Sequence, residues 1–357
     1  MKKSILLLCI LLFIPLLQGC TDSRRADSYK VQADKYLEEE DYKNAIIYYD
    51  KALEISPEKV GVLGGKAKAL EALGKYDEAI KECDKAIKIN PQLADVYNTK
   101  GNALSEKSEF ESALENYKAA YKLDPENAIY ISNISYALNM LELYDEALDY
   151  SDRAIEKNPK LSMAYLNKGY ALEGLDRPEE ALKLYDKAIE FDSNNVNAYI
   201  YKGDILNDAS KFEEAIKIYD KAINISKGKD SIDALVGKGD ALCHIGKYED
   251  SIQCFDKAIE ISPDTHEIHV FKGRSLYYLK KYNEALESLD KALAIDKDSS
   301  YAKLWKSKSL TMNSNYKEAE ELCKQVLDIE PGNSFAYDVK GCIYLKQSKF
   351  QQAIEMF

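Results

Sequence analysis

The chain holds few residues whose type and spacing suit metal binding or catalysis. His266-Glu267-Ile268-His269 places two imidazoles three residues apart, whereas the H-E-x-x-H zinc helix places them four apart. Gly64-Gly65-Lys66 lacks the spacing of a phosphate-binding P-loop. We therefore expect no enzyme, no metal site and no cofactor. A metal or enzyme site that uses Cys243, His244 or His269 remains the alternative.

One cysteine does stand in a recognisable chemical context, near the N-terminus. Lys2 and Lys3 precede an apolar run from Ile5 to Leu17, which has the form of a signal peptide and is short for a membrane span. The run ends in Leu17-Gln18-Gly19-Cys20, which resembles the lipobox of prokaryotic lipoproteins. The alternative is an uncleaved membrane anchor followed by an accidental Gly-Cys.

The lipobox resemblance implies a signal peptide at residues 1–19 and a lipidated Cys20, followed by a short linker up to residue 27. It also implies an extracytoplasmic protein of the cell envelope that is anchored to a membrane. The cysteines beyond Cys20 are scattered and lack CxxC pairing, so we expect small core residues rather than a disulfide framework. They are Cys83, Cys243, Cys254, Cys323 and Cys342.

The elements that must position any site repeat with a period of 34 residues. With Ala94 counted as position 1, position 8 is always small, as in Gly101, and position 20 is alanine in nine repeats of ten, as in Ala113. Position 17 is aromatic in nine of ten, as in Phe110. The spacings follow helical periodicity, so each repeat predicts two amphipathic helices joined by a tight turn. Small residues at positions 8, 20 and 27 should let the helix axes approach closely.

This pattern resembles the tetratricopeptide repeat. The resemblance implies an all-α fold, a right-handed superhelical solenoid of about ten helix-turn-helix units over residues 28–357. The predicted repeats are 26–59, 60–93, 94–127, 128–161, 162–195, 196–229, 232–265, 266–299, 300–333 and a truncated 334–357. The seventh repeat is offset at Lys227–Asp230, where we expect a local change of geometry or a hinge. Lysines at position 7, such as Lys100, should be structural.

The charge of the chain narrows the class of partner. Lysine and arginine number 49 against 61 aspartates and glutamates, which gives a net charge of −12. Nucleic-acid binding needs a basic surface, so we expect no nucleic-acid ligand. A protein or peptide partner is expected instead, and a basic one is compatible with this charge.

The resemblance also implies a concave groove lined by the first helix of each repeat. The side chains carried over to that groove are Asp95, Asn98, Asn102, Asn133, Tyr136, Asn167, Tyr170, Tyr201, Asp204, Asp240, Arg274 and Tyr278, and the same positions add Asp208, Asp233, Phe271, Tyr277, Tyr301 and Trp305. Asparagine and tyrosine suit the reading of an extended peptide. The Lys/Asn/Arg carboxylate clamp of the chaperone-binding members of the family is absent, because Asp34 stands where the clamp needs asparagine.

The sequence thus predicts a membrane-anchored scaffold that binds protein segments in its groove, in envelope assembly or secretion. The alternative is a structural protein that self-associates by stacking through its last repeat, Ser334–Phe357, as a homo-oligomer.

Overall fold

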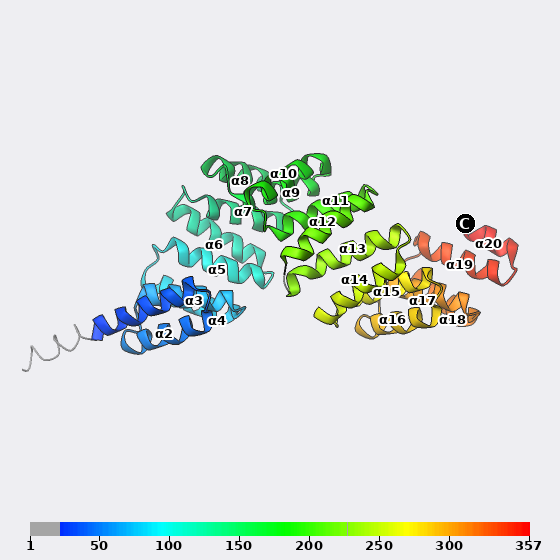
Figure 1. Ribbon diagram of the computed structural model, residues 1–357, viewed down its shortest axis with the longest axis horizontal. Coiled ribbons are helices and arrows are strands. Elements are labelled where there is room, and N and C mark those ends of the chain that lie inside the picture. The colour runs from blue at the N-terminus through cyan, green and yellow to red at the C-terminus, as the bar shows by residue number, and fades with distance from the viewer. Residues whose placement is uncertain (1–21, 227) are drawn as a thin grey trace, which may run out of the picture. The chain divides into compact units, whose positions relative to one another are not determined.

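The computed structural model describes residues 22–226 and 228–357 (Figure 1). The predicted signal peptide, the lipobox and Cys20 lie outside these residues. Within them the regular structure is entirely helical, which confirms the all-α solenoid of helix-turn-helix units. The chain divides into two compact parts, an N-terminal half up to Phe191 and a C-terminal half from Asp192 onward.

In the N-terminal half, a helix over residues 22–38 is followed by paired helices. Their bounds are α2 Tyr42–Ile55, α3 Val60–Ala72, α4 Tyr76–Ile89, α5 Ala94–Glu106, α6 Phe110–Leu123, α7 Ala128–Met140, α8 Tyr144–Lys157, α9 Ser162–Gly174 and α10 Pro178–Phe191. Each odd-numbered helix packs on the even-numbered helix after it, and α3 also contacts α5, as α7 contacts α9.

The C-terminal half continues the same alternation. Its helices are α11 Val196–Asp208, α12 Phe212–Ile225, the 3₁₀ helix η1 Gly228–Ser231, α13 Ile232–His244, α14 Tyr248–Ile261, α15 His266–Tyr278, α16 Tyr282–Ile295, α17 Ser300–Met312, α18 Tyr316–Ile329, α19 Ser334–Lys346 and α20 Phe350–Met356. The first helices α13, α15, α17 and α19 contact one another in sequence as well as their own partners.

The turn inside every repeat uses one residue in the left-handed region. Position 15 is glycine at Gly74 and Gly246, with φ of 74° and 78°. The other eight repeats place an L-residue there, as at Ser108 with φ of 61°. An L-residue in this region costs about 1–2 kcal/mol, so the packing of the two helices outweighs a local strain that recurs in each of those eight repeats.

The small residue at position 8 makes room for the side chain at position 24. A Cβ on Gly101 would lie 2.5 Å from the Tyr117 ring, and a Cβ on Gly239 would lie 2.7 Å from the Phe255 ring. Where position 8 is serine, position 24 is small as well: Ser135 Oγ lies 2.6 Å from Ser151 Oγ. The side chains at positions 8 and 24 of each repeat therefore fit together at the close approach of the two helices, and we call them the interlocking pair.

The lysines at position 7 bind the preceding repeat. Lys100 Nζ lies 2.6 Å from a carboxylate oxygen of Asp84, and Lys306 Nζ lies 2.8 Å from one of Asp290. The same pairing joins Lys66 to Asp50, Lys168 to Asp152, Lys238 to Asp220 and Lys272 to Asp256. Each pair links two repeats, so these lysines have a structural role, and the ammonium group forms an inter-repeat ion pair.

The structure changes one local expectation and adds detail to another. The expected linker up to residue 27 is helical from residue 22, and Ala26 is fully buried. It is the first residue of the predicted repeat 26–59 and lies one heptad before the equally buried Ala33, so the helix begins four residues before that repeat. At the offset of the seventh repeat, Gly228–Ser231 form η1, while Lys227 lies outside the described residues.

Candidate functional site

The first helices α3 and α5 of the N-terminal half line a cavity of about 680 Å³. We call this cavity and its rim the amide groove. Of the predicted residues, Asp95, Asn98 and Asn102 line it. Gly61, Gly64 and Gly65 of α3 are part of its lining, and a Cβ on Gly64 would lie 3.2 Å from a Val96 methyl group. A side chain at Gly64 would therefore occupy space in the groove.

Each predicted polar residue of the amide groove is held by a partner. The Tyr130 hydroxyl donates to Asp95 Oδ1, and the Asn133 amide donates to Asn98 Oδ1 at 2.8 Å. The Tyr117 hydroxyl donates to Asn102 Oδ1 at 3.0 Å. The oxygen of Asn98 is taken by this bond, and its side chain lines the groove. The amide donors that remain suit a ligand that offers carbonyl oxygens.

Asn133 and Asn167 differ from the expectation that they face the groove. They are 8% and 3% exposed. The Asn167 amide donates at 2.8 Å to the main-chain oxygen of Ser132, one helix away. Their side chains therefore tie α7 to its neighbours, because a buried amide must be hydrogen-bonded to be tolerated.

Tyr136 and Tyr170 lie on α7 and α9 and are half-buried. Burial raises the pKa of both phenols, so both rings stay neutral at physiological pH. They offer ring area and a hydroxyl group, but they are not among the residues that line the amide groove.

The amide groove carries a negative balance. Its lining includes Glu71, Asp95 and Asp124 against the single cation Lys68. Burial, with the nearby Glu106, raises the pKa of Glu71. Sequence reasoning missed Glu71 and Tyr130 as lining residues, although each lies on a predicted first helix.

In the C-terminal half a second cavity, of about 370 Å³, lies beside α11 and α13. We call it the acidic cleft. Its lining holds four carboxylates and no lysine or arginine: Asp204, Asp208, Asp233 and Asp240. Asp204 accepts a hydrogen bond of 2.6 Å from the Tyr219 hydroxyl, whereas Asp208 and Asp233 are exposed. Tyr201, also predicted, is half-buried on α11 and is not part of this lining.

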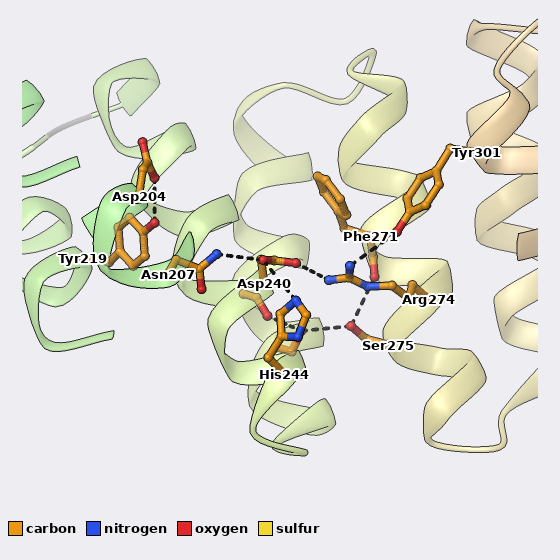
Figure 2. A network of polar contacts seen from close by, with 11 residues as sticks. Asp204, Asn207, Tyr219, Asp240, His244, Phe271, Arg274, Ser275 and Tyr301 are labelled. Atoms are coloured by element: carbon orange, nitrogen blue, oxygen red, sulfur yellow. Dashed lines mark hydrogen bonds and ion pairs between the residues drawn. The ribbon is translucent and has the colours of Figure 1, made fainter. Parts of the chain in front are cut away.

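A polar network leads out of the acidic cleft (Figure 2). Asn207 donates to Asp240 at 3.0 Å, and the Arg274 guanidinium donates to the other oxygen of Asp240. Burial alone would raise the pKa of Asp240, but the charge and hydrogen bond of Arg274 outweigh it and lower that pKa. Arg274 is 8% exposed, and the pKa of its guanidinium is raised because Asp240 outweighs its burial. The pair is therefore fully ionised.

Arg274 also lines a third cavity, of about 410 Å³, which we call the aromatic pocket. Its walls carry the rings of Tyr248, Tyr278, Tyr301 and Trp305, with Cys243 and His244 beside them. The Tyr248 and Tyr278 rings stack with centroids 5.5 Å apart, and Trp305 meets Tyr278 edge-on at 5.6 Å. Tyr278 and Tyr301 are 45% and 40% exposed, so ring faces held by their neighbours stay open to solvent. Tyr248 was missed because it lies at the start of a second helix.

Two of the three histidines and most of the cysteines in the described ranges are held in the packed interior or against a neighbouring ring. His269 Nε2 lies 2.9 Å from the main-chain oxygen of Pro263, and the His244 ring stacks on Phe212 at 4.8 Å. Five free cysteines lie in the described ranges, four of them buried. In residues 22–226 and 228–357, no group of three or more His, Cys, Asp or Glu side chains is arranged to hold a metal ion. No helix among those same residues is both long and apolar enough to cross a membrane.

Comparison with known proteins gives several matches to family models. Models described as tetratricopeptide repeat match residues 36–102 and 276–341, 98–162, 162–195 and 184–217. A model of anaphase-promoting complex, cyclosome, subunit 3 matches residues 208–292. Among curated proteins, DnaJ homolog subfamily C member 7 of Mus musculus is 36% identical over 64 residues, which are 18% of this chain and 13% of that protein.

Two solved structures are similar in fold. A tetratricopeptide repeat protein from Parabacteroides merdae ATCC 43184 is 16% identical, with a TM-score of 0.59 over 71% of this chain and 99% of that one. The anaphase-promoting complex hetero-tetramer Cut9-Hcn1 is 13% identical, with a TM-score of 0.62 over 92% of this chain and 76% of that one. At such identities the likeness concerns the fold alone.

Proposed function

Because this chain is a tetratricopeptide repeat protein, we propose that it is a scaffold that binds segments of partner proteins on its first-helix surfaces, tethered to a membrane of the cell envelope. The observation that carries the binding proposal is the amide groove. It combines a volume in the usual range for ligand sites with amide donors fixed in orientation by their partners, as at Asn98. Fixed donors lose little entropy when they bind a peptide backbone.

Site-specific photo-crosslinking in intact cells tests this proposal. A photoreactive residue at Asn98, in the amide groove, is expected to capture a partner protein. The matched control carries the same residue at Glu115, which is exposed on the second helix α6. Equal capture at both positions, or capture at neither, would contradict recognition by the groove.

The membrane tether is supported by the sequence around Cys20. Its apolar run and Gly19-Cys20 junction fit processing and lipidation, and one lipid chain gives only marginal binding, so a stable tether needs more than one. Replacing Cys20 with serine is expected to move the protein from the membrane fraction to the soluble fraction after salt washing. A Cys20→Ser protein that stays with the membrane would refute lipid anchoring at this residue and leave the groove unaffected. Envelope assembly or secretion is the process we propose for such a tethered scaffold.

A second candidate function is self-association through α20. Phe350, Ile354 and Phe357 are 62%, 69% and 67% exposed, and such an apolar face favours coverage by a second copy of the chain. Sedimentation of the purified protein over micromolar concentrations decides this. A monomer throughout that range removes the candidate, whereas a dimer that dissociates when Ile354 is changed to lysine supports it.

A further inference from the structure

We infer that the C-terminal half recognises a segment with a large apolar side chain and a basic residue about three positions away; this rests on the proposed function and names the chemistry of the partner. The apolar side chain enters the aromatic pocket, and the basic residue enters the acidic cleft. The ion pair between Asp240 and Arg274 joins the two cavities, because Asp240 lines the cleft and Arg274 lines the pocket.

The aromatic pocket selects an apolar occupant over a charged one. Ring faces give most of its walls, and the exposed parts of Tyr278 and Tyr301 offer apolar area that a partner can cover. Aromatic residues of this kind dominate interface energetics when they are desolvated. A cation in the pocket would be repelled by the buried Arg274 guanidinium. An anion would gain little attraction there, because Asp240 already neutralises Arg274, the only buried cation of the pocket.

The acidic cleft selects a cation. Asp208 and Asp233 are exposed carboxylates with no ion pair among the described residues. Arg274 neutralises Asp240, and Asp204 accepts the Tyr219 hydrogen bond, so Asp208 and Asp233 supply the negative charge that a ligand meets. A lysine or arginine of the partner therefore meets a net negative potential there, while a glutamate or aspartate is repelled.

The geometry of the helices sets the spacing of the two side chains. The cleft lies along α11 and α13, and the pocket lies along α13, α15 and α17, so we take the spacing of neighbouring first helices as the separation of the two cavities. Packed helices are about 8–10 Å apart, and an extended chain advances about 3.3 Å per residue. A spacing of about three residues between the basic and the apolar side chain follows.

Panning of a phage-displayed library of random dodecapeptides on the purified protein tests the inference. Peptides with Lys or Arg about three residues from Phe, Tyr, Trp, Leu or Met are expected to be enriched. The strongest peptide lacking tryptophan is then synthesised and titrated while the emission of Trp305 is recorded. Trp305 is the single tryptophan of the chain and a wall of the aromatic pocket, so occupation of the pocket changes its emission.

Variants measure how much each of the two cavities contributes to peptide binding. Tyr278→Ala is expected to weaken binding at least about tenfold, as for an aromatic hot spot, whereas Tyr278→Phe keeps it within about twofold because the ring remains. The double variant Asp208→Asn and Asp233→Asn is expected to weaken binding about threefold at low salt, and the loss disappears at 1 M salt, where the Debye length is about 3 Å.

Matched controls separate this inference from the scaffold proposal. Ile329→Ala removes an exposed apolar side chain elsewhere in the C-terminal half, and Glu249→Gln with Asp250→Asn removes two exposed charges from α14; both should leave affinity unchanged. If the peptides bind Tyr278→Ala as tightly as the wild type, the inferred role of the aromatic pocket is wrong, but the scaffold proposal is unaffected. Enrichment of peptides without the basic residue, or no enrichment at all, would overturn the inferred recognition. Crosslinking at Asn98 would still decide the scaffold proposal.

Discussion

Replacing Arg274 with methionine is expected to destabilise the C-terminal half. Methionine keeps most of the apolar stem and leaves the Asp240 carboxylate buried without its cation. Removing one partner of a buried ion pair costs about 3–5 kcal/mol. We expect about 3 kcal/mol, the lower end of that range, because Asp240 is 20% exposed and still accepts the Asn207 hydrogen bond.

Denaturant unfolding followed by Trp305 emission measures this effect, since Trp305 lies beside Arg274 in the aromatic pocket. Lys272→Met is the matched control on the same helix, because Lys272 pairs with Asp256 at the surface. An exposed pair of this kind contributes less than about 1 kcal/mol. The double variant Asp240→Asn and Arg274→Met should recover part of the loss, because no buried charge is left unpaired.

The pH dependence of the stability shows whether the pairing of Asp240 with Arg274 stabilises the fold. The pKa of Asp240 is lowered in the folded protein, so its pairing stabilises the fold above the unfolded pKa of about 3.9. This stabilisation is lost as the pH falls through the lower folded pKa. The difference between Arg274→Met and the wild type should therefore shrink in strong acid. A destabilisation no larger than that of Lys272→Met at pH 7 would refute the reasoning.

Three further measurements test the packing of the repeats. Gly101→Ala should cost about 1–3 kcal/mol by overpacking, because its Cβ would lie 2.5 Å from a tyrosine ring, whereas Gly332→Ala meets nothing within 4 Å; equal stability of the two variants would contradict the interlocking pair. Ser108→Gly should stabilise the fold by up to about 1 kcal/mol, because φ is 61° at Ser108. A loss of stability in this variant would show that Ser108 is unstrained. Burial raises the pKa of the Cys83 thiol to about 12, so the half-buried Cys342 should be alkylated long before Cys83 in the folded protein, as peptide mapping would reveal.

The helical repeat could be predicted from the sequence because each repeat sets the same constraints on residue size. The turn conformation could not. Glycine marks the left-handed residue only at Gly74 and Gly246, and the other repeats carry serine, glutamate, aspartate or lysine there. The turn length forces the conformation on whatever residue occupies position 15. The sequence at that position therefore carries little information about its φ.

The candidate sites were only partly predictable, because some first-helix side chains turn toward a neighbouring helix instead of the groove. Asn167 reaches the Ser132 main-chain oxygen and is 3% exposed, whereas Asn98 lines the amide groove. The Asp240–Arg274 pair did leave a signal, since the two residues occupy the same position in consecutive repeats with opposite charge.

Selectivity in this chain must come from the few first-helix positions that vary while the packing positions stay constant. At position 6, Asn133 and Asn167 are both buried amides of α7 and α9, whereas Trp305 occupies the same position on α17 and forms a wall of the aromatic pocket. The scaffold tolerates this exchange because position 6 is bounded by neighbouring first helices and not by the interlocking pair of positions 8 and 24. Position 6 can therefore hold a buried amide that ties first helices together in one half and a ring that lines a pocket in the other, at little cost to the fold.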